Sequence, residues 1–393
     1  MDVLFLTHAF PRAVGDPPGS FILRLATALA SEGVTATVLT PHAPGLPARD
    51  TIGGISVHRF RYAPESYETL AYTGTMAEQV RSAWSARAAL VGLLARLLVD
   101  GARMRRTLRP ALVHAHWWFP SGLAGATLSA VSGVPLVTTL HGSDVRLATP
   151  GSLAASLYAG VARRSRAVTA VSSWLAARAR SLAPSVSEPT VAPMPAAVEL
   201  FTPRAGPPGD ERLLFVGRLS EQKGLATLLR ALAELPTSVT LDVIGDGPDR
   251  EPLRALAATL GVSGRVRWRD AMPQSALADH YRAATALVVP SVEEGLGLVA
   301  VEAHLCQTPV VAFDSGGLRD VVADGETGIL VPRIDAPSLA AGIARLLSRA
   351  DKGTALGIEG RRRALERFSP EAVARRYAGI YRGAISHSTD RTS

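Results

Sequence analysis

The feature that most constrains the fold is a repeated alternation between short apolar runs and longer stretches with helical periodicity. Hydrophobic residues make up 47% of the chain, and the apolar runs are rich in Val, Leu and Ile. Strands that are apolar throughout are typical of parallel sheets covered by helices on both faces. The alternation therefore predicts an α/β chain. The expected strands are Val3–Thr7, Thr35–Leu39, Ile55–Arg59, Leu112–His116, Leu136–Leu140, Ala167–Val171, Arg212–Val216, Val239–Ile244, Val266–Arg269, Ala286–Val289 and Pro309–Phe313.

The length of the chain indicates two domains, because 393 residues exceed what one ordinary core accommodates. The alternation occurs once on each side of Phe201–Asp210, a segment rich in Pro and Gly that we interpret as a linker. We expect a first domain over residues 1–202 and a second over 203–368, each with a doubly wound parallel sheet. A capped amphipathic helix is expected over 369–385, followed by a polar, disordered tail over 386–393.

The net positive charge has two interpretations. The formal charge is +8, and it comes almost entirely from Arg residues scattered among Ala, Leu and Pro. A basic chain can bind nucleic acid, anionic membranes or phosphate ligands, but a bias in genome base composition gives the same charge. Because no helix-turn-helix or stacking platform is visible in the sequence, nucleic acid is not an expected partner.

The helical pattern over residues 76–108 carries several Arg side chains among apolar residues. We favour a core helix with a solvated face, and docking on an anionic membrane is the alternative. No basic region precedes the apolar run Val3–Leu6, which predicts a strand rather than a signal peptide. The apolar stretch 88–99 is too short to span a bilayer. We therefore expect a cytoplasmic chain, with peripheral contact to the inner face of the membrane left open.

Metal binding is not expected from the sequence. Cys306 is the single cysteine, so neither an internal disulfide nor a cysteine metal cluster can form. His114 and His116 alternate on an expected strand, and no third ligand is evident. We therefore favour a half-buried strand end over a metal site for these two side chains.

The most informative motif runs from Pro290 to Glu302. A buried strand ends at Pro290, a turn containing Gly295 and Gly297 follows, and a helical pattern continues through Glu302. A helix N-terminus exposes unpaired N–H groups and about half a positive charge, which favours an anion. Carboxylates accept hydrogen bonds from hydroxyl groups, in which sugars are rich. With Glu294 before the helix and Glu302 inside it, the motif suits a nucleotide sugar.

Two more motifs follow strands of the second half. Gly217, Arg218 and Lys223 come directly after the strand that ends at residue 216, and Lys223 is one of only two lysines in the chain. The Arg fork and the Lys point charge both pair well with phosphate oxygens, so this loop suits a diphosphate. Two solvated loop charges are the alternative. Gly245 follows the next strand and allows either an ordinary tight turn or a close approach to a ligand.

Loops of the first half offer a second group of candidates. His141 and Asp144 follow an expected strand, where they suit contact with a sugar or with each other. Gly15 and Gly19 follow the first strand and precede a helix, so backbone N–H groups can approach a phosphate there. The chain lacks the Gly-x-Gly-x-x-Gly pattern and a Walker lysine, which counts against NAD enzymes and ATPases.

Together these motifs resemble family 4 of the retaining glycosyltransferases, which have the GT-B fold. The segments that carry the resemblance are Glu294–Glu302, Val216–Gly224, Gly245–Pro248, Phe10–Gly19 and His141–Asp144. The resemblance implies two facing Rossmann-like domains with a cleft between them. The first domain would bind the acceptor and the second a nucleoside-diphosphate sugar. The final helix is implied to cross back to the first domain.

The resemblance also implies roles for individual residues. Arg218 and Lys223 would bind the diphosphate, Glu294 the donor-sugar hydroxyls and Glu302 the ribose hydroxyls. His141 would lie by the donor sugar, across the cleft. The remaining donor-binding positions are Gly19, Asp144, Gly217, Gly245, Gly295, Leu296, Gly297 and Leu298. Neither a metal nor another cofactor is implied, since the nucleoside-diphosphate sugar is a co-substrate.

The expected activity is transfer of a hexosyl group, with retention, from a UDP- or GDP-sugar to a hydroxyl of a sugar, lipid-linked or small-molecule acceptor. The resemblance suggests attack on the same face, with the leaving phosphate helping to deprotonate the acceptor. Glu294 is not expected to act as a covalent nucleophile. Retaining hydrolases place two carboxyl groups about 5 Å apart across the bond, and a helix rise of about 1.5 Å per residue argues against that pairing for Glu294 and Glu302. The rival hypotheses are an epimerase or hydrolase on the same fold and a non-catalytic binder of sugar nucleotides.

Overall fold

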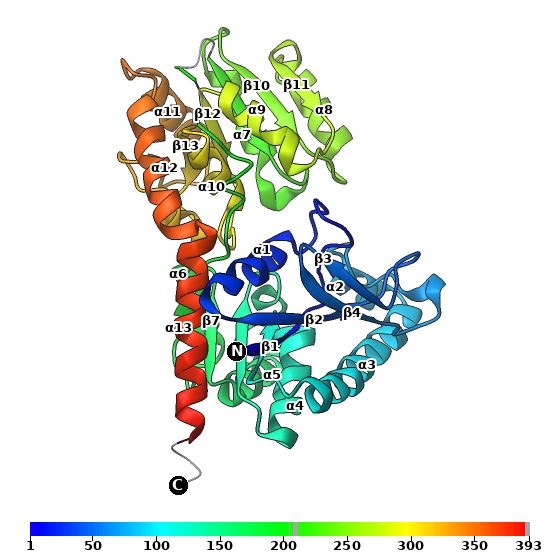
Figure 1. Ribbon diagram of the computed structural model, residues 1–393. Coiled ribbons are helices and arrows are strands. Elements are labelled where there is room, and N and C mark those ends of the chain that lie inside the picture. The colour runs from blue at the N-terminus through cyan, green and yellow to red at the C-terminus, as the bar shows by residue number, and fades with distance from the viewer. Residues whose placement is uncertain (204, 207–210, 390–393) are drawn as a thin grey trace. The chain divides into compact units, whose positions relative to one another are not determined.

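The chain forms two α/β units in the computed structural model (Figure 1), which describes residues 1–203, 205–206 and 211–389. Unit 1 comprises Met1–Pro195 together with Pro370–Ser393, and unit 2 comprises Ala196–Ser369. Each unit is built on one sheet whose strands are joined by helices, as the alternation in the sequence predicts.

Unit 1 contains an eight-stranded sheet with the order β3-β4-β2-β1-β5-β6-β7-β8. The central strand β1 pairs in parallel with β2 on one side and with β5 on the other, and the edge pair β3–β4 is antiparallel. The chain changes direction across the sheet at β1, and ligands of open α/β sheets bind beyond the carboxyl ends of strands at such a point. The strands are β1 Asp2–Leu6, β2 Thr35–Pro41, β3 Arg49–Ile52, β4 Ile55–Phe60, β5 Leu112–His116, β6 Leu136–Leu140, β7 Ala167–Ala170 and β8 Thr190–Val191.

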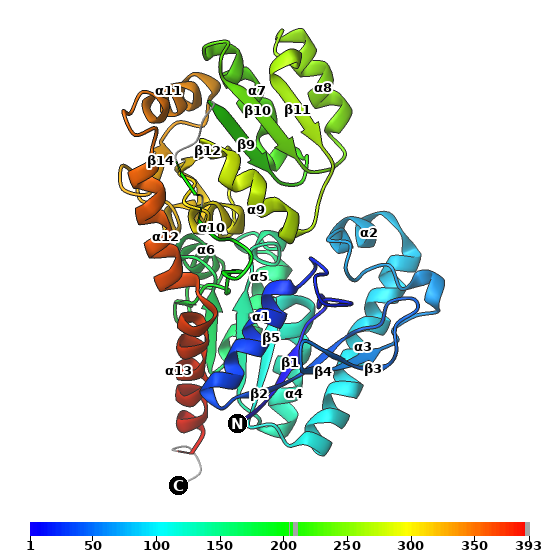
Figure 2. The same ribbon diagram turned by 45° about the horizontal axis from the view of Figure 1, so that its top comes forward.

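Helices cover both faces of this sheet. Side chains that alternate along β5 point to opposite faces and therefore contact different helices. Val113 and Ala115 belong to the core beneath α3 and α4, whereas His114 contacts Tyr381 of α13 on the other face. Figure 2 shows α3 and α4 together, and α1 near α13. The helical segments are α1 Ser20–Ala28, η1 Leu29–Glu32, η2 Glu65–Tyr67, α2 Met76–Ser82, α3 Trp84–Leu108, η3 Trp118–Gly122, α4 Leu123–Ser132, η4 Val145–Leu147, α5 Leu153–Arg164, α6 Ser173–Leu182 and α13 Pro370–Thr389.

The final helix, α13, belongs to unit 1. Its Tyr377 hydroxyl donates to the carbonyl oxygen of Ala192 at 3.1 Å, and both Tyr377 and Tyr381 are fully buried. The prediction of a disordered tail from residue 386 was wrong as far as Thr389, because the helix continues to that residue. The hydroxyl of Ser386 donates to the carbonyl oxygen of Gly383, as a polar side chain does on a continuing helix. Residues 390–393 lie outside the described part of the chain.

Unit 2 contains a six-stranded, all-parallel sheet with the order β11-β10-β9-β12-β13-β14. Its core is formed by apolar side chains of the strands and of α7, α8 and α11. The strands are β9 Arg212–Val216, β10 Thr240–Ile244, β11 Val266–Arg269, β12 Ala286–Val289, β13 Val310–Phe313 and β14 Gly328–Val331. The helical segments are η5 Glu221–Lys223, α7 Leu225–Glu234, α8 Arg250–Thr259, η6 Ser263–Arg265, α9 Gln274–Ala283, α10 Leu298–Leu305, η7 Gly316–Asp320, α11 Ala336–Leu347 and α12 Thr354–Phe368.

Unit 2 begins earlier than the expected boundary at residue 202. Ala196 donates its N–H to the carbonyl oxygen of Phe368, and Phe201 is fully buried against Tyr281, both within unit 2. Arg361 also donates to the carbonyl oxygen of Phe201 at 3.0 Å. The start of the expected linker is therefore part of a packed core. Residues 204 and 207–210 of that segment lie outside the described residues.

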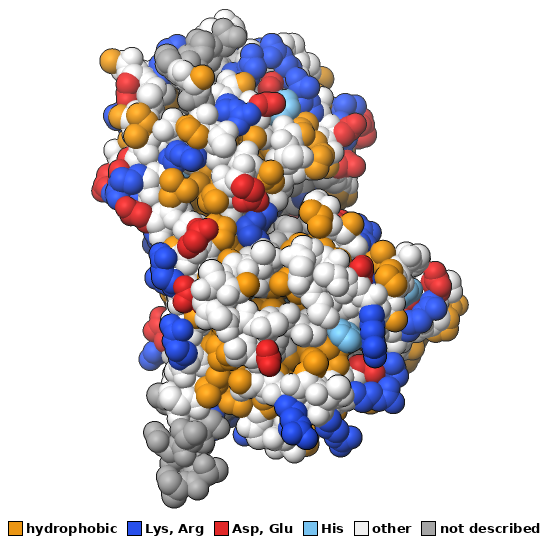
Figure 3. Space-filling view, viewed as in Figure 1, with side chains coloured by type: hydrophobic (Ala, Val, Ile, Leu, Met, Phe, Trp, Pro, Cys, Tyr) orange, Lys and Arg blue, Asp and Glu red, His pale blue; other side chains and the backbone are white. Residues whose placement is uncertain are grey.

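The Arg-containing pattern over residues 76–108 forms two helices rather than one. Ala83 is extended (φ −133°, ψ 135°) and separates α2 from α3. The buried residues of α3 recur every three or four positions, as a core helix with a solvated face requires. Positive side chains are spread over both units on the face shown in Figure 3. Among the residues searched, no helix is both long and apolar enough to cross a membrane.

Candidate functional site

Four loops at the carboxyl edge of the unit 2 sheet pack backbone against backbone, and glycines make the contact possible. A Cβ built on Gly245 would lie 1.9 Å from the carbonyl oxygen of Gly217, and one on Gly224 would lie 2.0 Å from that of Pro290. Such distances leave no room for any side chain. The loops after β9, β10 and β12 are therefore held together at what we call the loop edge of unit 2. Gly217 and Gly245, which were candidates from the sequence, both take part in this packing.

The loop after β13 clamps Glu294 in the same way. The N–H of Gly317 donates to the carbonyl oxygen of Glu294 at 2.8 Å, and a Cβ on Gly316 would lie 2.5 Å from that oxygen. Glu293 adopts a positive φ of 55°, which is uncommon for a residue with a side chain, and its N–H donates to the hydroxyl of Ser315. These bonds fix the backbone from which the Glu294 carboxylate projects.

Lys223 and Glu294 form an ion pair at the loop edge. Lys223 Nζ lies 2.6 Å from Glu294 Oε2, and both side chains are partly exposed, at 26% and 17%. Arg218, from the same loop as Lys223, is exposed, and its side chain makes no hydrogen bond or ion pair within the described part of the chain. The sequence therefore places two cations and a carboxylate on neighbouring loops, as its motifs predict.

Helix α10 starts at Leu298, after the Gly295–Gly297 turn that follows Glu294, and brings its N-terminus to the same edge. Gly297 precedes the helix with φ 88°, and a Cβ there would lie 2.7 Å from Leu318 Cδ2 and 3.6 Å from Glu294 Cγ. Leu298 begins the helix, whose first amides have no partner one turn earlier. Their dipoles favour an anion next to the Lys223–Glu294 pair. Leu296 is only 6% exposed, so its side chain packs inward while the backbone of Gly295–Gly297 forms the turn.

Glu302 lies on the buried side of α10, and its surroundings differ from those of Glu294. The Tyr281 hydroxyl donates to Glu302 Oε2 at 2.8 Å, and Gln274 Nε2 donates to Oε1 at 2.7 Å. Burial and the Glu302 charge raise the pKa of Tyr281 well above its ordinary value. Glu302 is 6% exposed. Neither Tyr281 nor Gln274 was singled out by a sequence motif: Tyr281 lies inside α9, and Gln274 begins that helix after a loop without glycine.

Unit 1 carries the second group of predicted residues, beyond the carboxyl end of β6. Asp144 is buried, and its carboxylate accepts bonds from the N–H groups of Trp118 at 3.0 Å, Gly142 at 2.9 Å and His141 at 3.2 Å. Burial raises the pKa of Asp144, and these amide bonds counteract that rise. Asp144 thus holds the His141 loop in place, which is one of the two interpretations that the sequence allowed.

The His141 ring lies in a cluster of imidazole and aromatic side chains. His141 Nε2 is 3.1 Å from His116 Nδ1, and its ring centroid is 4.4 Å from that of Trp117 and 5.1 Å from that of Phe21. Burial lowers the pKa of both His141 and His116 well below the ordinary value. Both rings are therefore neutral near pH 7, and a single N–H···N hydrogen bond joins them.

The prediction that His114 and His116 lie at a half-buried strand end was wrong in its burial. Both side chains are fully buried. Tyr377 and Tyr381 of α13 pack on the His114 ring, and Phe5 and His141 pack on the His116 ring. His114 is hydrogen-bonded through Nδ1 to the Tyr381 hydroxyl at 2.7 Å and through Nε2 to the Thr139 hydroxyl at 2.7 Å. Burial lowers the pKa of His114 to about 3. Both ring nitrogens of His114 are therefore engaged by protein groups.

Gly19 ends the loop after β1 and allows it to fold tightly. Its φ is 70°, and a Cβ there would lie 2.5 Å from the carbonyl oxygen of Ala9. Gly19 also lines a cavity of about 930 Å³ within unit 1, together with Trp117, Asp144 and other residues. Gly19, His141 and Asp144 therefore gather at the carboxyl edge of the unit 1 sheet, while Arg218, Lys223, Glu294 and Glu302 belong to unit 2.

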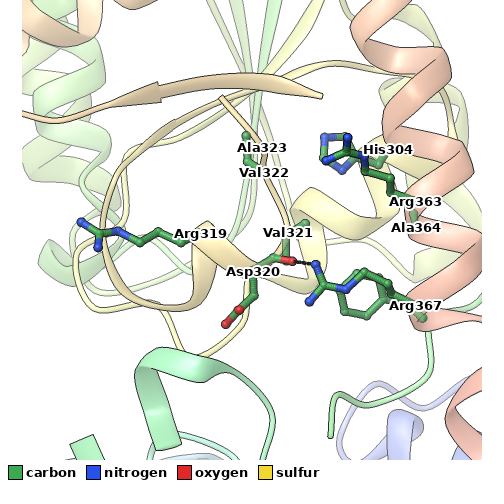
Figure 4. A pocket seen from close by; sticks show the side chains of 10 residues that line it. His304, Arg319, Asp320, Val321, Val322, Ala323, Arg363, Ala364 and Arg367 are labelled. Carbon is green, nitrogen blue, oxygen red and sulfur yellow. Dashed lines mark hydrogen bonds between the residues drawn. The ribbon is translucent and has the colours of Figure 1, made fainter. Parts of the chain in front are cut away.

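A second hollow, in unit 2, is small, and its arginine side chains bond to other groups of the protein. It measures only about 40 Å³ and is lined by His304, Arg319, Arg363 and Arg367, among others (Figure 4). Arg319 pairs with Asp314, Arg363 with Glu359, and Arg367 donates to the carbonyl oxygen of Asp320. The hollow has space for only a few water molecules. Among the described residues, no group of three or more His, Cys, Asp or Glu side chains has an arrangement that could hold a metal ion.

Comparisons with known proteins cover both units. Residues 199–363 match the model of glycosyl transferases group 1, and residues 19–195 match that of glycosyltransferase family 4. The 2-deoxystreptamine N-acetyl-D-glucosaminyltransferase of Streptomyces fradiae is 31% identical, over 93% of this chain and 89% of its own.

Two solved structures are similar along the whole chain. Sucrose-phosphate synthase from Thermosynechococcus elongatus has a TM-score of 0.81 at 24% identity, covering 98% of this chain and 100% of its own. HepE from Anabaena, solved in complex with UDP-glucose, has a TM-score of 0.70 at 21% identity, covering 97% of this chain and 99% of its own. With the two parallel sheets, these likenesses confirm the GT-B fold class. The chain is a glycosyltransferase and belongs to glycosyltransferase family 4, with the group 1 glycosyl transferases matching its second half.

Proposed function

We propose that this enzyme transfers a hexosyl group, with retention and without a metal, from a UDP- or GDP-hexose to an acceptor hydroxyl. The observation that carries the proposal is the Lys223–Glu294 pair beside the start of α10. It combines a cation and a helix N-terminus for a diphosphate with a carboxylate for sugar hydroxyls. The complex of HepE with UDP-glucose supports a donor of this class.

In the proposed reaction, the bond between the anomeric carbon and the diphosphate oxygen breaks, and its electron pair stays on the leaving phosphate. The acceptor oxygen bonds to the anomeric carbon on the same face, and its proton passes to an oxygen of the leaving phosphate. Lys223, Arg218 and the α10 amides stabilise the negative charge as it grows. Glu294 binds the donor-sugar hydroxyls, and Glu302 the ribose hydroxyls.

Donor screening followed by acceptor screening tests this function. A saturating UDP- or GDP-hexose should raise the melting temperature, because a ligand at 100 times its Kd adds about 2.7 kcal/mol of stability. With an acceptor present, nucleoside diphosphate should form in step with a glycoside of unchanged anomeric configuration, as proton NMR shows. Donor consumption without an acceptor would instead indicate a hydrolase or an epimerase, and an absence of turnover with any acceptor would indicate a binding protein.

Metal independence gives a second expected result. Because Lys223, Arg218 and the α10 amides are proposed to carry the charge of the diphosphate, enzyme treated with EDTA should keep its full transfer rate. The measurement compares initial rates in EDTA with rates after Mg²⁺ or Mn²⁺ is added. A rate that collapses in EDTA and returns with either ion would contradict this part of the proposal.

We also propose that His116 positions His141, which we assign to the donor sugar. His116 Nε2 is buried and has no hydrogen-bond partner among the described residues. A buried N–H without a partner is rarer than a bare ring nitrogen. His116 is therefore assigned a proton on Nδ1, which it donates to His141 Nε2. His141 must then carry its own proton on Nδ1, where it can donate to a substrate oxygen.

Replacement of His116 with Phe keeps a ring in the buried site and removes the bond to His141. We expect kcat to fall about fivefold, the cost of one hydrogen bond between neutral groups of about 1 kcal/mol. His116→Asn places an amide N–H near the position of Nδ1 and should recover most of the loss. Steady-state kinetics and melting curves check both variants, and an unchanged kcat in a well-folded His116→Phe enzyme would refute the positioning role.

A further inference from the structure

The cavity of unit 1 has predominantly apolar walls. It measures about 930 Å³, which is roomier than a single sugar ring requires. The loops after β1 and β5, the helices α1, α2 and α3, and η3 supply its apolar side chains. Among these are Phe21, Met76, Val80, Leu90, Trp117 and Phe119. Trp117 and Phe21 also pack on the His141 ring, so the cavity opens beside the residue that we assign to the donor sugar.

The polar groups in these walls are largely occupied by the protein itself. The Asp144 carboxylate accepts three backbone N–H bonds, and the Tyr72 hydroxyl donates to the carbonyl oxygen of Pro41 at 2.6 Å. Ser143 accepts the indole N–H of Trp117 at 3.1 Å. His8 is an exception, because its Nδ1 has no hydrogen-bond partner among the described residues. Burial lowers the pKa of His8 to about 4, so this ring is neutral near pH 7. Among the lining residues, Asp144 is the one carboxylate, and its amide partners occupy it.

Two positive side chains line the same cavity. Arg81 comes from α2 and Arg146 from η4, and both are exposed. Neither guanidinium has a hydrogen bond or an ion pair with any residue that the structure describes. Arg binds phosphate oxygens through a planar pair of N–H donors, so two unpaired guanidiniums beside an apolar wall favour a ligand that is both anionic and apolar.

We propose that the acceptor is an amphiphile, with an apolar body in this cavity and a phosphate group held by Arg81 and Arg146. This inference rests on the proposed function, because it names the acceptor class of the same transfer. A cationic, polyhydroxylated acceptor, such as an aminocyclitol, would meet two guanidiniums and no available carboxylate here. The acceptor named for the Streptomyces fradiae relative belongs to that class. The two enzymes therefore differ in acceptor chemistry.

The test is calorimetric binding to the full-length enzyme without any donor, with octyl phosphate below its micelle concentration as the probe. Octanol, inorganic phosphate and 2-deoxystreptamine are compared under the same conditions. Octyl phosphate should bind at least about tenfold more tightly than each of the three. Its chain strengthens binding about fourfold per buried methylene relative to inorganic phosphate, and its phosphate can form charge-assisted bonds with the two guanidiniums that octanol cannot form. Equal affinity for octanol would overturn the role of the phosphate, and equal affinity for inorganic phosphate would overturn the role of the apolar wall.

Variants locate the probe in the cavity. Arg81→Gln and Arg146→Gln should each weaken octyl phosphate binding about tenfold, while Arg178→Gln leaves it unchanged. Arg178 is a matched control, because it is an exposed Arg of α6 in the same unit and does not line this cavity. Equal losses in all three variants, or no loss in any, would overturn the assignment.

The outcome is separable from that of the proposed function, because the assay needs neither donor nor turnover. If octyl phosphate binds as described but no donor supports transfer, the proposed donor chemistry fails and this inference stands. If transfer proceeds to a polyol acceptor and octyl phosphate does not bind, the amphiphilic acceptor class is refuted and the proposed transfer stands.

Discussion

Replacement of Lys223 with Ala should lower hexosyl transfer by about 10²–10³-fold, the usual cost of losing one preorganised charge contact at a transition state. The ammonium group lies 2.6 Å from Glu294 Oε2 in the absence of substrate. When the diphosphate leaves, its new negative charge would face the Glu294 carboxylate with no cation between them. The variant therefore loses the attraction between the ammonium group and the leaving diphosphate, and it leaves the repulsion between the diphosphate and the Glu294 carboxylate unscreened. Both effects raise the activation free energy of transfer. Initial-rate measurements at saturating donor check the expected loss.

Lys352→Ala is the matched control, since Lys352 is the other lysine of the chain and pairs with Glu211 in the same unit at 3.8 Å. Its transfer rate should equal that of the unmodified enzyme. Both variants should melt close to the unmodified enzyme, because partly exposed ion pairs contribute little to stability. Glu294→Ala should also reduce transfer severely. Near-normal turnover in a well-folded Lys223→Ala or Glu294→Ala enzyme would contradict the assigned roles.

The second large effect is expected from Gly316→Ala, which should reduce transfer about 100-fold without touching a charged group. The new methyl group would lie 2.5 Å from the carbonyl oxygen and 2.6 Å from the nitrogen of Glu294. Both contacts are with backbone atoms, so the loop after β12 has to move. Gly316 also has a φ of 62°, which Ala adopts with strain. The Glu294 carboxylate and the start of α10 are displaced together, and a misplacement of about 1 Å is enough for such a loss.

Gly264→Ala separates this effect from a general cost of adding a methyl group. A Cβ on Gly264 meets no atom within 4 Å, and the residue lies in η6 of the same unit. Donor binding by calorimetry should weaken for Gly316→Ala and stay unchanged for Gly264→Ala, with circular dichroism to confirm that both fold. A Gly316→Ala enzyme with full donor affinity and full rate would show that the position of this loop does not matter for transfer.

Much of the loop edge of unit 2 was predictable from sequence, because its residues follow strands directly. The apolar runs located β9, β10 and β12, and the glycines and charges after them had to meet at one edge of a parallel sheet. Lys223 and Glu294 are 71 positions apart, and their contact is a consequence of that topology. The strands β3 and β8 escaped prediction because Arg49–Ile52 is mainly polar and Thr190–Val191 has only two residues. The strand β14 also escaped prediction, although it is as long and as apolar as β12.

The surroundings of the buried groups were not predictable, because they depend on side chains from distant helices. His114 is covered by Tyr381, 267 positions away, and nothing in the His-x-His pattern signals that partner. Glu302 receives Tyr281 and Gln274 from α9, whose helical periodicity indicates burial but not hydrogen bonding. The unit boundary at Pro195 similarly depends on the packing of Phe201 rather than on Pro and Gly content.

The central claim is that the loop edge of unit 2 holds a sugar diphosphate between its basic side chains and the start of α10. A crystal structure of the enzyme with a bound UDP- or GDP-hexose tests it most directly. We expect the diphosphate within hydrogen-bond distance of Lys223, Arg218 and the amide of Leu298, with the hexose hydroxyls on Glu294. Density for the nucleotide at any other place, with Lys223 still paired to Glu294 and no phosphate beside it, would contradict the claim.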